Sequence, residues 1–144
     1  VDQLASQLLE QQQKVVSLTA YKVLSIELAA GLGHTFYDNE TDYETVYFDK
    51  EIQHDFASWV SGNSMEPLYP NGSVALMKQT GFDYDGAVYA LIWNGKTYIK
   101  KVYREAEGLR LESINPDYDD LFAPYEDEPK IVGIVVGHFL PLEV

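Results

Sequence analysis

Short apolar runs separated by tight-turn signals constrain the fold of this chain more than any other feature of its sequence. Beyond Phe56 these runs are rich in Val, Ile, Tyr and Leu. The turn signals between them are Pro70-Asn71-Gly72, Asp85-Gly86, Asn94-Gly95, Glu107-Gly108 and Asn115-Pro116. Short strands at close spacing are typical of an all-β domain. The sequence therefore predicts a mainly β fold of short strands and hairpins.

Two of the runs can be placed within such a sheet. Residues 88–93 and 96–103 flank Asn94-Gly95, a strong signal for a hairpin with a two-residue turn. The run 131–137 is apolar on both of its faces. We therefore expect it to be a central strand, or a strand that another subunit covers.

The first residues predict a helix. Apolar side chains recur there at helical a and d spacing, in a Gln-rich stretch free of Gly and Pro as far as Lys22. They are Val1, Leu4, Leu8, Val15 and Leu18, with Gln11 interrupting the stripe. We expect a short amphipathic helix over residues 1–20 and one domain over residues 21–144. The helix is either a linker that packs on this domain or part of an oligomer interface.

From Tyr21 the pattern changes to the alternation of a strand. Leu24, Ile26, Leu28 and Ala30 share one face. The predicted strand runs into Gly31-Leu32-Gly33, where two glycines end it. Residues 34–55 mix polar, aromatic and acidic side chains, and we expect them to form an exposed hairpin or loop region.

Composition limits the classes of function. The 144 residues are 46% hydrophobic, which is enough to bury a core. There are 23 acidic and 10 basic side chains, so the formal charge is −13, which opposes approach to a phosphate backbone. Cysteine is absent, which excludes disulfides and thiolate metal ligands and favours a cytoplasmic location. No apolar run reaches the roughly 18 residues that span a bilayer, so we expect no membrane contact.

The densest candidate for chemistry is the segment 59–67, Trp-Val-Ser-Gly-Asn-Ser-Met-Glu-Pro. Ser64 lies there in a small bend, where a hydroxyl and free backbone amides would provide the two parts of an acyl-transfer site. The same residues are ordinary turn formers, so the segment alone leaves both interpretations open. His34, His54 and His138 lie in no recognisable catalytic context, and we expect surface or structural roles for them.

A lysine can serve as the base for a serine if burial removes its charge. Lys100 and Lys101 lie on opposite faces of the predicted strand 96–103, and each face carries apolar neighbours. Periodicity does not choose between them, and two exposed hairpin lysines would have the same pattern. No spacing of His, Asp and Glu predicts a metal site, and we expect the acidic run 117–128 to be a solvated loop.

Three motifs, taken in order, resemble the LexA-type self-cleaving repressor family, which includes LexA, lambda-like phage repressors and the UmuD polymerase subunits. Ser-Gly-Asn-Ser-Met-Glu-Pro at 61–67 is followed by Thr-Tyr-Ile-Lys-Lys-Val at 97–102, and Leu-Ala-Ala-Gly at 28–31 lies upstream. The resemblance covers roughly residues 21–144 and is most specific around Ser64. It implies a LexA- or signal-peptidase-like β domain, C-terminal in the whole repressor, that cuts itself.

The resemblance also implies roles for individual residues. Ser64 would be the nucleophile and Lys100 the neutral general base, while the backbone amides of Asn63 and Ser64 would stabilise the oxyanion. The cleaved bond would be Ala30-Gly31, in an intramolecular reaction that needs no cofactor. A RecA filament would stimulate this cleavage, and the domain would form a homodimer.

The front of the sequence departs from the family. A repressor of this type begins with a helix-turn-helix domain, and only one possible helix precedes Tyr21. We therefore expect that domain to be absent from this chain, and operator DNA to be bound only through it. One alternative is a non-cleaving dimerisation module that an antirepressor-type partner switches. Another is a UmuD-like polymerase accessory protein, which the long lead-in before Ala30-Gly31 disfavours.

Overall fold

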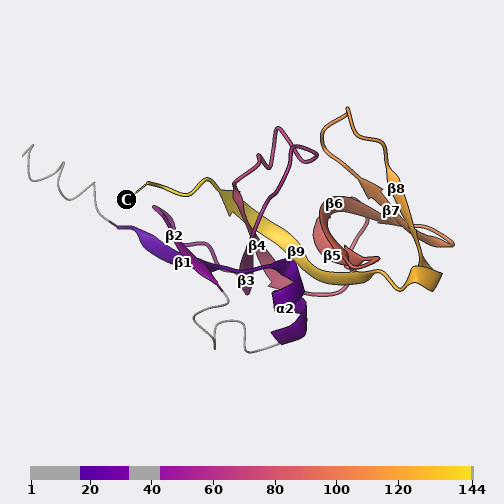
Figure 1. The fold of residues 1–144 in the computed structure, drawn as a ribbon, viewed down its shortest axis with the longest axis horizontal. Helices are drawn as coiled ribbons and strands as arrows, with labels where there is room; N and C mark the ends of the chain where they lie inside the picture. The colour runs from indigo at the N-terminus through magenta and orange to yellow at the C-terminus, as the bar shows by residue number, and fades with distance from the viewer. Residues whose placement is uncertain (1–16, 33–42, 144) are drawn as a thin grey trace, which may run out of the picture.

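The computed structural model describes residues 17–32 and 43–143. Among these residues, nine strands form one sheet in the order β2-β1-β3-β4-β9-β5-β6-β7-β8 (Figure 1). The strands are β1 Thr19–Val23, β2 Glu44–Phe48, β3 Phe56–Trp59, β4 Val74–Gln79, β5 Val88–Trp93, β6 Lys96–Arg104, β7 Gly108–Glu112, β8 Leu121–Pro124 and β9 Lys130–Phe139. The helices of this part of the chain are α2, Ile26–Leu32, and a single 3-10 turn, η2, Tyr125–Asp127. The predicted mainly β fold is confirmed.

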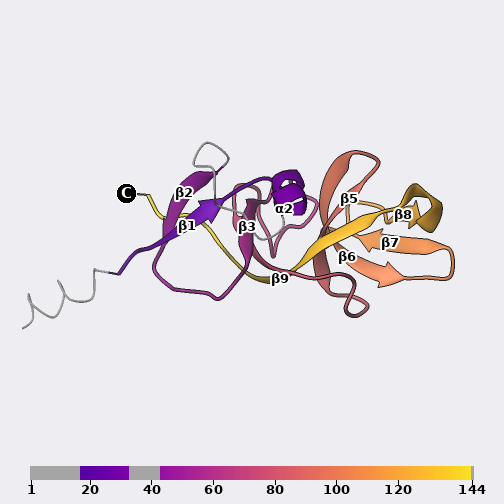
Figure 2. The same cartoon turned by 90° about the horizontal axis from the view of Figure 1, so that it is seen from below.

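β9 joins the two halves of the molecule. It pairs antiparallel with β4 along its C-terminal part and with β5 along its N-terminal part. Figures 1 and 2 show it running between the half that contains β1 to β4 and the half that contains β5 to β8. The prediction of a central strand over residues 131–137 is confirmed. Its apolar side chains pack against two core clusters, Val132 and Val135 in one and Ile131 and Ile134 in the other.

The β5–β6 hairpin is also confirmed. Trp93 pairs with Lys96, so the connection consists of Asn94 and Gly95. Both turn residues have positive φ, 52° for Asn94 and 73° for Gly95. Asn and Gly adopt this left-handed conformation most readily, which is why the dipeptide specifies the turn.

The N-terminal helix predicted over residues 1–20 lies mostly outside the described residues. Its last part is wrong, because β1 begins at Thr19 and pairs antiparallel with β2 and parallel with β3. β2 lies within the region 34–55 that was expected to be a hairpin or loop, and it forms the edge of the sheet beside β1.

The strand predicted from Tyr21 to Ala30 is wrong in its second half. β1 ends at Val23, and α2 begins three residues later. The Ser25 hydroxyl accepts a hydrogen bond from the amide of Leu28 at 3.0 Å, which satisfies an otherwise unpaired donor of the first helical turn. Ile26 and Ala29 are one turn apart and buried together in the core. Burial of this helical face against the sheet overrides the local alternation.

The acidic run 117–128 is not simply a solvated loop. It contains β8, which pairs with β7, and η2, which follows directly. Ala123 on β8 is fully buried in the core of the β5–β8 half. The carboxylates of Asp117, Asp119 and Asp120 belong to exposed residues that precede the strand.

The largest core cluster lies where α2, the turn after β3 and the central strands meet. It consists of Leu24, Ile26, Ala29, Phe56, Val60, Met65, Tyr69, Ala75, Met77, Ala90, Ile99 and Val132. Met65 is therefore anchored in the core directly after Ser64. This packing fixes the turn that carries the candidate nucleophile.

Candidate active site

Ser64 lies in a turn whose backbone is tied down on both sides. The amide of Gly62 donates to Oδ1 of Asn71 at 2.8 Å, and the amide of Glu66 donates to the carbonyl of Asn63 at 3.2 Å. Gly62 has a φ of 80°, a conformation that glycine adopts without strain. These contacts hold the Ser64 side chain at the mouth of a pocket.

Lys100 approaches the same pocket from β6. Its Nζ donates to Oγ of Ser64 at 2.6 Å and to Oγ of Ser113 at 2.9 Å. The residue is only 7% exposed, and burial lowers the pKa of its amine because the charged form loses hydration. The structure thus brings together Ser64 and Lys100, the two side chains named as nucleophile and base.

Lys101 lies on the other face of β6. Its Nζ is 3.6 Å from Oε1 of Glu112, and its side chain is 36% exposed. It therefore faces away from Ser64, as alternation along a strand requires.

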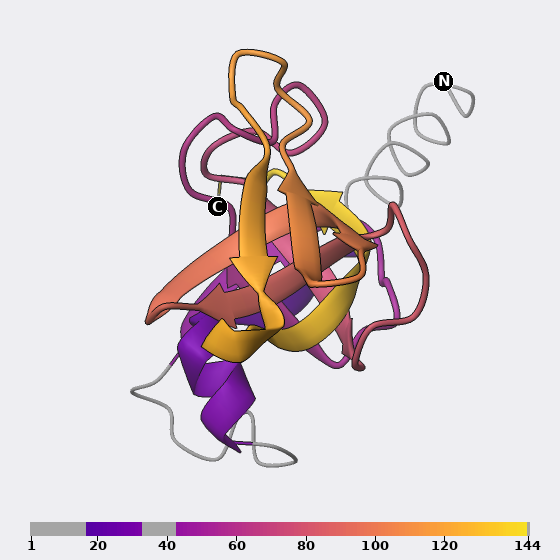
Figure 3. The same cartoon turned by 90° about the vertical axis from the view of Figure 1, so that its right-hand side faces the viewer.

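The segment after β7 covers the Ser64 turn. The amide of Asn115 donates to the carbonyl of Ser64, and its side-chain Nδ2 donates to the carbonyl of Asn63, both at 3.0 Å. The Tyr118 hydroxyl donates to Oδ1 of Asn63, and the Tyr118 ring lies 5.8 Å from Nζ of Lys100. Figures 1 and 3 show the two loops side by side, beyond the ends of the strands.

Sequence reasoning missed Ser113 and Tyr118, and it identified Asn115 only as part of a turn signal. Their contacts join positions far apart in the chain, such as Tyr118 and Asn63, which are 55 residues apart. No local periodicity encodes such a contact. The turn signal Asn115-Pro116 directly after a strand was the one available indication that a loop meets the site.

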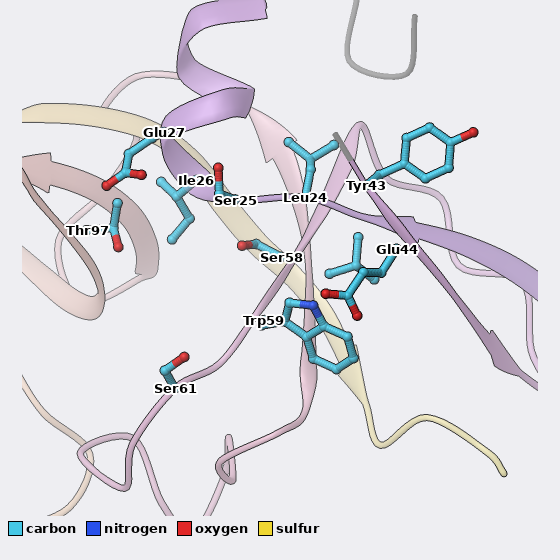
Figure 4. Close-up of a pocket in the computed structure, with 11 residues that line it drawn as sticks. Leu24, Ser25, Ile26, Glu27, Tyr43, Glu44, Ser58, Trp59, Ser61 and Thr97 are labelled. Carbon is cyan, nitrogen blue, oxygen red and sulfur yellow. The ribbon is translucent and has the colours of Figure 1, made fainter. Parts of the chain in front are cut away.

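The pocket beside Ser64 and Lys100 encloses about 370 Å³ and is largely apolar. Its walls are Ile26, Trp59, Val60, Ser61, Met65, Thr97, Tyr98, Ile99, Tyr118 and Leu121. A second pocket adjoins it and shares Ile26, Trp59, Ser61 and Thr97 (Figure 4). This neighbour is more polar and is lined by Glu27 and Glu44 as well as by hydroxyl groups.

The structure does not bring Ala30 and Gly31 into the Ser64–Lys100 pocket. Both residues are in α2, and Ala30 lines a different pocket together with Gln79 and Ile131. Gly31 is exposed, and a Cβ atom built on it would meet nothing within 4 Å. The bond between them is therefore helical and lies apart from the candidate nucleophile.

The two described histidines lie elsewhere. Nδ1 of His54 is 2.7 Å from the carbonyl of Ile52, and the His138 ring packs edge-on against Tyr69 at 4.7 Å. Neither lines the Ser64–Lys100 pocket, and His34 lies outside the described residues. Within residues 17–32 and 43–143, no group of three or more His, Cys, Asp or Glu side chains could hold a metal ion. The same residues include no helix long and apolar enough to cross a membrane.

A buried amine in contact with a hydroxyl can take its proton, provided that the amine is neutral. Among the described residues, the backbone amides of Asn63 and Ser64 donate no hydrogen bond, whereas the preceding Gly62 amide does. Two unpaired amides beside a hydroxyl are suited to receive a negatively charged oxygen. The chemistry available to this pocket is acyl transfer from a peptide or ester.

Several known proteins are similar to this chain in sequence. The sequence model of the Peptidase S24-like family matches residues 22–136. LexA repressor of Lacticaseibacillus casei (strain BL23) is 31% identical over 118 residues, which are 79% of this chain and 55% of that protein. Repressor protein CI of Enterobacteria phage phi80 is 40% identical over 77 residues, 52% of this chain and 32% of that protein. HTH-type transcriptional regulator PrtR of Pseudomonas aeruginosa is 34% identical over 80 residues, 53% of this chain and 31% of that protein.

The family match extends over the strands that carry the site, from the end of β1 to most of β9, and includes both Ser64 and Lys100. The chain spans about half the length of the LexA relative, 55%. The resemblance to LexA-type repressors that the three motifs indicated is confirmed, and this chain belongs to the Peptidase S24-like family, with LexA and phage CI repressors among its relatives.

Proposed function

We propose that this chain is the self-cleavage and dimerisation domain of a transcriptional repressor, and that it cuts its own Ala30-Gly31 bond. The contact of 2.6 Å between Nζ of Lys100 and Oγ of Ser64 carries the proposal. Burial favours the neutral amine, which a Ser-Lys peptidase needs as its base. Similarity to LexA and CI repressors supports the regulatory context.

The proposed reaction has two halves. Neutral Lys100 takes the proton of the Ser64 hydroxyl while Oγ attacks the carbonyl carbon of Ala30, and the amides of Asn63 and Ser64 stabilise the oxyanion. The C–N bond to Gly31 then breaks, and the new amine leaves with the proton from Lys100. Lys100 then takes a proton from water, the water oxygen attacks the Ser64 ester, and Lys100 returns the proton to Oγ of Ser64 as the Ala30 carboxyl group leaves and ionises.

The helical state of the bond must be lost before this attack. Neither Ala30 nor Gly31 lines the Ser64–Lys100 pocket, and the regular geometry of the helix holds the Ala30 carbonyl away from Oγ of Ser64. α2 has only seven residues, and isolated helices of this length are marginal in water. Unwinding of the second half of α2 is therefore an accessible step. Because the Ala30-Gly31 bond is in the same chain as Ser64, no separate substrate has to bind.

Cleavage would separate a DNA-binding half from the dimer contacts. A linked pair of DNA-binding domains holds two operator half-sites far more tightly than single domains do. Cutting the linker would release the operator and derepress its genes. We propose that a RecA filament stimulates this step, and that operator DNA is bound through a helix-turn-helix domain outside this sequence.

The location of Ala30 and Gly31 favours one alternative function. Since both residues are in a helix and neither lines the Ser64–Lys100 pocket, the domain could instead dimerise without cutting itself and be switched by an antirepressor-type protein. Self-cleavage and this alternative differ in a simple observable, the intact mass of the chain.

The deciding experiment is incubation of the purified chain at alkaline pH without RecA, followed by intact-mass spectrometry. We expect fragments 1–30 and 31–144, because alkaline pH supplies the neutral form of Lys100. Ser64→Ala and Lys100→Ala should lower the rate by at least about a thousandfold, since nucleophile or base is lost.

Lys101→Ala is the matched control, because it removes the neighbouring lysine that pairs with Glu112. It should cleave nearly as fast as the wild type. Unchanged cutting in Ser64→Ala would instead indicate a contaminating protease, and an intact wild-type chain at every pH would favour the non-cleaving alternative.

A further inference from the structure

A second hydroxyl contacts the amine of Lys100. Ser113 follows β7 directly, is 9% exposed, and accepts a hydrogen bond of 2.9 Å from Nζ. The amine of Lys100 is therefore shared between the hydroxyls of Ser64 and Ser113. Buried hydroxyls are kept where they have a partner, because an unpaired one is costly.

The contact between Ser113 and the Lys100 amine can fix the orientation of that amine. A neutral amine has two N–H donors and one lone pair, and the lone pair must point at the Ser64 hydroxyl to take its proton. A lysine side chain rotates freely about four bonds. An acceptor that holds one N–H therefore restricts the direction of the lone pair.

We propose that Ser113 is a positioning residue for Lys100, whose buried hydroxyl holds the ε-amine so that its lone pair faces Ser64. This inference rests on the proposed self-cleavage, and it adds a third side chain to the Ser64–Lys100 pair. Ser113 reaches the amine from the position directly after β7, so the site depends on the β6–β7 pairing as well as on the β5–β6 hairpin.

The other groups that face Lys100 would not mask the effect of Ser113. They are the Ser64 hydroxyl and the ring of Tyr118, 5.8 Å from Nζ. Among the ion pairs of the described residues, none includes Lys100. A hydroxyl oxygen that accepts from the ammonium stabilises the charged form, so its removal should lower the pKa of Lys100 further.

The test is the pH dependence of self-cleavage in Ser113→Ala and Ser113→Thr. Alanine removes the acceptor. It should lower the plateau rate at least tenfold and move the midpoint of the profile to lower pH. Threonine keeps the hydroxyl and should restore most of the rate. Ser73→Ala, which removes a fully buried hydroxyl bonded to the Pro70 carbonyl, should leave plateau and midpoint unchanged.

Two results would overturn the inference: an unchanged plateau in Ser113→Ala, or a lower plateau without a shift of the midpoint, which indicates general disruption. A second measurement does not need cleavage. In a Ser64→Ala background, NMR titration of the Lys100 ε-methylene should give a lower midpoint after Ser113→Ala, and an equal midpoint would contradict the contact. Failure of the wild type to cleave would reject the proposed function, while this titration would still decide the role of Ser113.

Discussion

Lys100 and Lys101 are adjacent in the chain and meet opposite environments. Lys100 is buried against two hydroxyls, whereas Lys101 pairs with Glu112 at the surface. The sequence alone could not assign the buried one, because both faces of β6 carry apolar side chains and both are partly buried. Ile99 and Val102 are buried on opposite faces, so the hairpin has no clean solvent side.

The environment of Lys100 predicts the pH dependence of cleavage. Only the neutral amine can act as base, so the rate should rise with pH and level off once Lys100 is deprotonated. Since burial lowers the pKa of this amine, the midpoint should fall below about 10.4, the value for lysine in water. Rates of intact-mass loss from neutral to alkaline pH measure this profile. A rate that is flat or falls with pH would remove Lys100 as the base.

At the scale of elements, the β5–β6 hairpin and the central strand β9 were predictable, whereas β8 and α2 were not. Turn dipeptides mark strand ends directly, as Asn94-Gly95 does. A helix of seven residues is only two turns long, so four apolar residues in alternation fitted a strand equally well. The available signal was Ser25 before Ile26, with Glu27 in the first turn, which is a helix start.

The cap of α2 gives a prediction for the cleavage rate. Ser25→Ala removes the hydroxyl that accepts from the Leu28 amide, which should destabilise the helix by about 1 kcal/mol. If unwinding of α2 precedes attack, self-cleavage should become up to about fivefold faster. Ser25→Asp keeps an acceptor at the cap and should cleave at the wild-type rate. A slower or equal rate in Ser25→Ala would show that α2 does not have to unwind.

The central strand predicts a sharp difference between two of its glycines. A Cβ at Gly133 would lie 2.7 Å from the backbone oxygen of Lys78 and 3.0 Å from the ring of Phe56. Gly133→Ala should therefore cost about 1–3 kcal/mol of unfolding free energy. At Gly137 the nearest atom is 3.3 Å away and belongs to the flexible side chain of Ile52. Urea denaturation should show a smaller loss in Gly137→Ala, and equal losses would contradict this account.

At the scale of the molecule, the candidate site depends on connections that no local pattern contains. Ser64 follows β3, Lys100 is in β6, and the strand that separates their halves of the sheet is the C-terminal β9. Resemblance to a family linked Ser64 with Lys100 from sequence, while composition and periodicity did not. Neither the family resemblance nor the sequence pattern pointed to Ser113. The roles of these residues in cleavage remain predictions that the variants above can test.

The homodimer expected for this domain involves the surface of the whole molecule near the C-terminal end of β9. β9 is covered on both edges, yet Val136 is the extra residue of a β-bulge opposite Leu76 and Met77 and is 41% exposed. Leu140, just beyond the strand, is 57% exposed. Exposed apolar side chains at the end of a central strand favour a self-complementary contact about a two-fold axis.

We therefore expect the double variant Val136→Glu/Leu140→Glu to weaken the dimer at least tenfold, because each of the two protomers would bring two carboxylates into the interface, where they would be desolvated. Sedimentation velocity across a range of protein concentrations measures the dissociation constant of the dimer. Tyr84→Glu is the matched control, since Tyr84 is 57% exposed and belongs to the turn before β5, away from the end of β9. A wild-type chain that stays monomeric at high concentration would reject the dimer, and equal weakening by Tyr84→Glu would reject its location at β9.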